Sequence, residues 1–107
     1  MTQKILLIAI SIGVFVYASA AQAAEVIIVQ AATSTTPALI SIEGEFVQGD
    51  EKEFTRRVLD VDTAIVRLSS PGGNLYAGIQ MGKAIRLKQF STLVTNDSTC
   101  ASACALA

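Results

Sequence analysis

The stretch Thr63–Asn74, which reads TAIVRLSSPGGN, decides the fold of this chain. Its first six residues are nearly continuous in apolar and β-branched side chains, as is typical of a buried parallel strand. The Pro-Gly-Gly sequence that follows predicts a sharp turn. After the turn, apolar or small residues recur at helical spacing, at Leu75, Ile79, Gly82 and Ile85. The stretch therefore predicts a buried strand that turns directly into a helix.

The rest of the chain after residue 24 continues this alternation of strands and helices. Strands are predicted over Glu25–Gln30, Ala38–Ile42 and Ser91–Thr95. A first helix is predicted between the second and third strands, with Asp50 as its N-cap. Another helix is expected to begin at Ser102. The order β-β-α-β-α-β-α predicts an α/β fold with a mostly parallel sheet.

The first 23 residues are typical of an export signal rather than of a folded domain. Lys4 precedes the apolar run Ile5–Tyr17, and Ala21–Ala23 fits the small-residue pattern of a cleavage site. Ala18–Ala20 is an alternative cleavage site. An uncleaved membrane anchor is the other interpretation, but the apolar run is shorter than the roughly 20 residues that span a bilayer. We therefore expect residues 1–23 to be a signal peptide and the protein to be periplasmic or secreted, with membrane contact only through an uncleaved signal.

Charge and composition exclude several classes of function for residues 24–107. This part carries seven basic and nine acidic residues, a net charge of −2. The basic residues are scattered except for Arg56 and Arg57, so we expect no nucleic-acid partner. The chain has two cysteines and no histidine, too few ligands for a zinc-type site, and we expect neither a metal nor a cofactor.

The two cysteines, Cys100 and Cys104, flank a serine in the sequence Cys-Ala-Ser-Ala-Cys. Export to an oxidising compartment permits a disulfide. Four residues apart, the two cysteines could bridge if the segment is a turn that leads into a helix. Such a bridge would fix the backbone around Ser102. Two buried free thiols that pack as small apolar groups are the equally weighted alternative.

The turn and the serine segment are the candidate site. The Pro-Gly-Gly turn exposes backbone amides at the carboxyl edge of the sheet, where α/β proteins bind ligands, although an ordinary tight turn has the same composition. Gly72 and Asn74 are candidate substrate-binding residues, because glycine lets a ligand approach the backbone. Ser102 has small neighbours and begins a helix, which also suits a simple N-cap. We predict that the amides of Gly73 and Ala103 face an oxyanion formed at Ser102.

These motifs resemble the proteolytic subunit of the Clp protease. The resemblance rests on Ser70–Gly73, on Ala77 and Gly78 of the thin helix, and on Ala101–Ala103, with Gly73 and Ser102 29 positions apart. It covers the chain from about Ile40 onward, and the signal peptide and paired cysteines bring it closer to the exported Clp-like proteins of bacteria. The resemblance implies a ClpP/crotonase-type fold of repeated ββα units, a peptide or protein substrate, and a homo-oligomer in the complete protein. It also implies Ser102 as the nucleophile, with Gly73 and Ala103 as the oxyanion hole.

The chain differs from that family because it lacks a general base for the serine. The family's histidine and aspartate lie downstream of the serine, and this sequence has no histidine. We therefore expect an N-terminal fragment of a serine endopeptidase, cut after the start of the nucleophile helix and inactive as these 107 residues. Lys83 and Lys88 are expected to be solvated rather than to act as the base. The alternatives are a non-catalytic exported binding module or degenerate remnant, and a crotonase-type enzyme acting on acyl thioesters.

Overall fold

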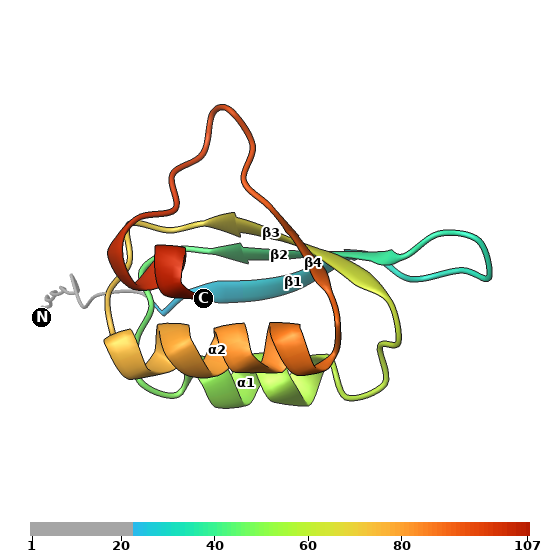
Figure 1. Ribbon diagram of the computed structural model, residues 1–107, viewed down its shortest axis with the longest axis horizontal. Helices are drawn as coiled ribbons and strands as arrows, with labels where there is room; N and C mark the ends of the chain where they lie inside the picture. The colour runs from blue at the N-terminus through green and yellow to red at the C-terminus, as the bar shows by residue number, and fades with distance from the viewer. Residues whose placement is uncertain (1–22) are drawn as a thin grey trace, which may run out of the picture.

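The structure, a computed structural model, describes residues 23–107 as one mixed sheet with two helices on one face (Figure 1). The predicted signal peptide, apart from Ala23, lies outside the described residues. In chain order the elements are β1 (Glu25–Gln30), β2 (Ala38–Glu43), α1 (Asp50–Arg57), β3 (Ala64–Ser69), α2 (Leu75–Leu87), β4 (Ser91–Leu93) and the 3₁₀ helix η2 (Ser102–Leu106). None of the helices in this described part is long and apolar enough to cross a membrane.

The four strands lie in the sheet in their sequence order, β1-β2-β3-β4. β1 pairs with β2 in antiparallel fashion, whereas β2–β3 and β3–β4 are parallel pairs. The predicted α/β class is thus confirmed, and the sheet is mixed. β4 ends at Leu93, two residues earlier than predicted, and the chain then arches away from the helices before it returns to η2 (Figure 1).

β3 shows why only one face of the sheet forms the core. Ala64, Val66 and Leu68 are buried, while the residues between them are partly exposed. The predicted parallel strand is confirmed, but it is fully buried on one face only, because α1 and α2 cover one side of the sheet (Figure 1). On the open face Arg67 donates to Ser41 Oγ at 3.2 Å and lies 3.4 Å from Glu43 Oε2.

The start of α1 differs from the sequence prediction. Gly49, with a φ of 104°, is the N-cap, and Asp50 is the first helical residue. The capping role predicted for Asp50 is wrong because its carboxylate turns back to accept from the Val47 amide, at 2.8 Å. Glu53 does not complete a capping box; hydrogen bonds from Arg56 and, secondarily, Arg57 lower the pKa of its carboxyl.

α2 buries a different face from the one that its large apolar residues suggest. Leu75 is 54 % exposed and Ile79 is 36 % exposed. The buried residues are two small ones, Ala77 and Gly78, and two large ones, Met81 and Ile85. A methyl group on Gly78 would lie 2.5 Å from the carbonyl oxygen of Ala103 in η2. The close packing predicted for this thin helix is confirmed, and its partner is the segment that begins at Ser102.

The end of α2 is fixed by a Schellman motif. The amide of Gln89 donates to Arg86 O, and the amide of Phe90 donates to Ile85 O, both at 3.0 Å. Gln89 occupies the left-handed position of the motif with a φ of 58°. Phe90 is buried with Ile85 in the core, so the motif also anchors the entry into β4.

Candidate functional site

The Pro-Gly-Gly turn and the serine segment lie side by side at the carboxyl edge of the sheet. Ser70 and Cys100 form an isolated parallel bridge beyond the ends of β3 and β4. The Ser70 amide donates to Thr99 O at 2.6 Å, and the Ala101 amide donates to Ser70 O at 3.1 Å. The parallel pairing of β3 and β4 therefore brings together two segments that are about thirty residues apart, as their positions after successive strands predict.

Gly72 makes the direct contact between the two segments. A methyl group at this position would lie 2.8 Å from both Ser102 Cβ and Ala101 O, closer than Cβ atoms in proteins approach other atoms. Gly72 also has a φ of 108°, in the region that side chains disfavour. Only glycine fits here, because any side chain would displace the backbone that carries Ser102.

The turn is held in place from its other side by Phe46. The Phe46 amide donates to Gly72 O at 2.7 Å, and Phe46 O accepts from the Asn74 amide at 2.8 Å. Within the turn, the buried Ser70 hydroxyl accepts from the Gly72 amide at 3.0 Å. The bond to Ser70 occupies the amide of Gly72. Sequence reasoning missed the roles of Phe46 and Ser70, since a lone aromatic or serine gives no pattern.

Ser102 has an unusual backbone for a residue with a side chain. Its φ is 55°, in the left-handed region, and its preceding residue Ala101 is extended. Non-glycine residues in this region carry strain and occur preferentially at functional sites. Ser102 is exposed, and no residue within 23–107 accepts a hydrogen bond from its hydroxyl. The strained turn thus presents a free hydroxyl to solvent.

The two amides predicted to form an oxyanion hole belong to Gly73, which follows the contact residue Gly72, and to Ala103, which follows Ser102. Neither the Gly73 nor the Ala103 amide donates to an acceptor in the described part of the chain. Gly73 is exposed. Ala103 is 1 % exposed, and a methyl group on Gly72 would lie 3.1 Å from its nitrogen. Gly73 is therefore open to solvent, whereas Ala103 is buried beside Gly72.

Cys100 and Cys104 form a disulfide in the structure, with their Cα atoms 5.1 Å apart. The bridge closes a small loop that contains Ser102. Because the loop is short, its entropic contribution to global stability is small. Its main physical effect is local: it ties the end of the Ser70–Cys100 bridge to the first turn of η2.

The remaining sequence candidates have other contacts. Asn74, a predicted substrate-binding residue, is the N-cap of α2, and its Oδ1 accepts from the Ala77 amide at 2.8 Å. Lys88 donates to Leu59 O at 3.4 Å and lies over the Phe90 ring. Lys83 is exposed. None of the hydrogen bonds among residues 23–107 connects either lysine to Ser102.

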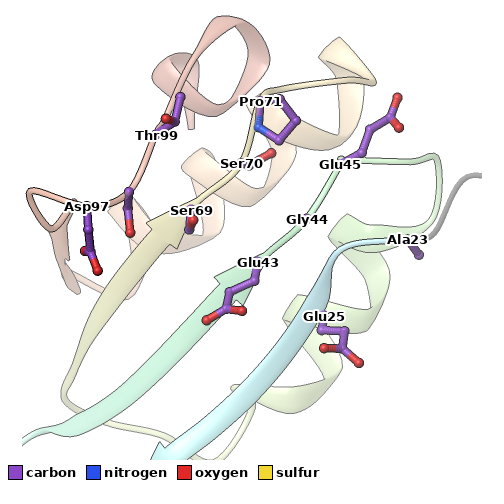
Figure 2. Close-up of a pocket in the computed structure, with 11 residues that line it drawn as sticks. Ala23, Glu25, Glu43, Gly44, Glu45, Ser69, Ser70, Pro71, Asp97 and Thr99 are labelled. Carbon is purple, nitrogen blue, oxygen red and sulfur yellow. The ribbon is translucent and has the colours of Figure 1, made fainter.

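An acidic cavity of about 620 Å³ lies beside the turn, at the edge of the sheet (Figure 2). Its lining includes four carboxylates, those of Glu25, Glu43, Glu45 and Asp97. Ser70 and Pro71 also line it, whereas Ser102 does not. Sequence reasoning missed this cavity because its acids come from separate segments. The one available signal was that Glu25 and Glu43 stand at strand ends, where the structure pairs them directly across β1 and β2.

Glu25 and Glu43 are thus like charges placed opposite each other, an arrangement that disfavours the pairing. Arg67, 3.4 Å from Glu43 Oε2, offsets part of this repulsion. In the described part of the chain, no group of three or more histidine, cysteine, aspartate or glutamate side chains is placed to hold a metal ion.

The resemblance to the Clp family stays a prediction drawn from the two motifs. No protein-family model, curated protein or solved structure matches this chain.

Proposed function

We propose that this chain is the nucleophile-bearing part of an exported serine peptidase of Clp type. The observation that carries the proposal is the left-handed, solvent-facing Ser102 in contact with the Gly72 turn. A serine held in a strained turn, at the point where a helix begins, is arranged to project its hydroxyl toward a ligand. The substrate class that suits this site is an extended peptide, and the complete protein is proposed to form a homo-oligomer.

In the proposed reaction, Ser102 Oγ attacks the carbonyl carbon of a peptide bond. The hydroxyl proton passes to a general base, and the amine leaves with a proton from the same group. Water then hydrolyses the acyl-serine. The proposed donors to the oxyanion are the amides of Gly73 and Ala103. One such donor contributes roughly 3 to 4 kcal/mol to the stability of the transition state.

The proposal requires a general base within hydrogen-bond distance of Ser102 Oγ. The 107 residues contain no histidine, and Lys88 is bonded to Leu59 O. We therefore assign the base to a residue that this sequence does not include. Without it, a serine hydroxyl is a weak nucleophile, so these residues alone are expected to show little hydrolysis.

Covalent labelling of Ser102 tests the proposal. The protein as its native cells export it is treated with a fluorophosphonate, which bonds to an activated serine Oγ with loss of fluoride. We expect labelling at Ser102 and its loss in Ser102→Ala. Ser98→Ala is the matched control, because Ser98 lies in the same loop and its hydroxyl pairs with Thr95. Absence of labelling in the wild-type protein, or equal labelling of Ser102→Ala, would contradict the peptidase function.

A second candidate, a non-catalytic exported binding module, is favoured by the acidic cavity. The cavity lies beside the turn but is not lined by Ser102, and its four carboxylates suit a cationic group. In the labelling experiment this function predicts an unmodified Ser102. Hydrolysis of an acyl thioester that persists in Ser102→Ala would instead indicate the crotonase-type alternative.

A further inference from the structure

Asp50 is a buried carboxylate whose hydrogen bonds lead to the start of the domain. It is only 5 % exposed, and no lysine or arginine within residues 23–107 forms an ion pair with it. Its Oδ2 accepts from two backbone amides, that of Val47 at 2.8 Å and that of Ala24 at 3.2 Å. A buried carboxylate without a cationic partner is costly, so the nature of these two donors matters for the fold.

Ala24 is the residue that follows the sequence-predicted cleavage site, Ala21–Ala23. The chain crosses from solvent into the core at this point, because Ala23 is exposed and Ala24 is 8 % exposed. Ala24 packs against Gly44, where a methyl group would lie 3.3 Å from Ala24 Cα. The nitrogen of Ala24 is therefore fixed beside the Asp50 carboxylate by the packing around it.

We propose that removal of the signal peptide after Ala23 creates a buried ion pair between the new α-amino group of Ala24 and Asp50. Hydrolysis of the Ala23–Ala24 bond by a signal peptidase consumes one water. Ala23 keeps the carboxyl group, and Ala24 keeps an amino group that takes up a proton at neutral pH. A neutral amide donor thereby becomes an ammonium at the same place, and its bond to the carboxylate becomes charge-assisted.

The burial of Ala24 sets the order of events. A peptidase cannot reach a bond whose carboxyl-side residue is packed in the core, so cleavage precedes folding. The ion pair then forms as the domain folds, and it supplies Asp50 with the cationic partner that the rest of the described chain does not. In an uncleaved chain, Asp50 accepts only the weaker hydrogen bond from the neutral Ala24 amide.

The ion pair is connected to the candidate site through the segment Phe46–Val47. Asp50 also accepts from Val47, and the adjacent Phe46 holds both ends of the Gly72–Asn74 turn. Processing at Ala23 therefore stabilises the segment that positions this turn. The proposal depends on the cleavage site and on Asp50, and it holds whether or not Ser102 is a nucleophile.

The experiment uses the full chain, exported from a bacterial host with its own signal. N-terminal sequencing of the exported product is expected to begin at Ala24. The product is then treated at neutral pH with an amine-acylating reagent, and mass spectrometry follows modification of the Ala24 nitrogen. We expect the folded protein to react at least about tenfold more slowly than the same protein in urea, because the ammonium is buried and paired.

Two matched variants separate the charge of Asp50 from general burial. Asp50→Asn keeps the shape but loses the charge, so the Ala24 amine is expected to react about tenfold faster than in the wild-type protein. Glu51→Gln removes the neighbouring buried carboxylate, which accepts from Gly49 and not from Ala24, and should leave the rate unchanged.

Three results would overturn the proposal: a product that begins elsewhere than Ala24, equal reactivity of the folded and urea-treated wild-type protein, or equal rates in folded Asp50→Asn and Glu51→Gln. Circular dichroism shows whether Asp50→Asn is folded. If it is not, the comparison of folded and urea-treated wild-type protein decides the outcome.

Discussion

Ser102 shows how a single residue can hold backbone strain. With a φ of 55°, it occupies a region that costs roughly 1–2 kcal/mol for a residue with a side chain. Replacement by glycine removes this cost. We expect Ser102→Gly to raise the free energy of unfolding by about 1 kcal/mol, measured by urea denaturation, and to abolish fluorophosphonate labelling.

Ser102→Ala separates the backbone from the hydroxyl in this prediction. Alanine retains the unfavourable φ but lacks Oγ, so its stability should stay near that of the wild-type protein while labelling is lost. If Ser102→Gly is no more stable than Ser102→Ala, the left-handed backbone is not strained and the structural argument for Ser102 fails.

At the scale of the elements, the end of α2 offers a stabilising substitution. Gln89 occupies the left-handed position of the Schellman motif, which glycine adopts without strain. We expect Gln89→Gly to raise the free energy of unfolding by about 0.5–1 kcal/mol in urea denaturation. Lys88→Gly is the control, because Lys88 has a right-handed φ of −84° and glycine there should destabilise the protein. A gain in both variants, or in neither, would contradict this account.

The elements themselves were largely predictable because their signals are local. Strand composition places β1, β2 and β3 within one residue of their observed bounds, and helical spacing places the start of α2 at Leu75. The errors have tertiary causes. Asp50 is not a cap because its carboxylate accepts hydrogen bonds from the Val47 and Ala24 amides. Leu75 is exposed because the face of α2 that carries Gly78 and Gly82 packs against η2. Neither contact has a local signal in the sequence.

At the scale of the whole molecule, the contact between the Gly72 turn and the serine segment is the most demanding junction. A methyl group on Gly72 would overlap Ser102 and Ala101, whereas one on Gly49, which has a similar φ of 104°, would meet no atom within 4 Å. We expect Gly49→Ala to cost about 1–2 kcal/mol through its backbone alone. Gly72→Ala should cost a further 1–3 kcal/mol or so from overpacking. Urea denaturation of both variants measures the difference in their free energies of unfolding. Equal losses of stability would show that the contact between the turn and the serine segment accommodates a methyl group without cost.

The candidate site was predictable in its location but not in its detail. Parallel pairing of β3 and β4 brings Ser70–Gly73 to the serine segment, as the order of elements indicates. Which glycine touches Ser102 depends on Phe46, a residue from the β2–α1 connection that clamps the turn. The acidic cavity depends on four separate segments. Contacts of this kind arise from the assembled fold, so no sequence window contains them.

The small-residue contact between α2 and η2 has a consequence for reading mutational scans of this protein. Gly78 and Gly82 face the backbone of Ala103 and Ala107, where a methyl group would lie 2.5 Å from the nearest atom. Both positions would therefore reject nearly every substitution in a scan selected for activity. In such a scan, Gly78 and Gly82 would be as sensitive to substitution as a catalytic residue, although their close contacts are with backbone atoms. A parallel scan of cellular abundance would separate them, because substitutions at scaffold positions lose protein, whereas the proposed nucleophile Ser102 is expected to tolerate replacement without that loss.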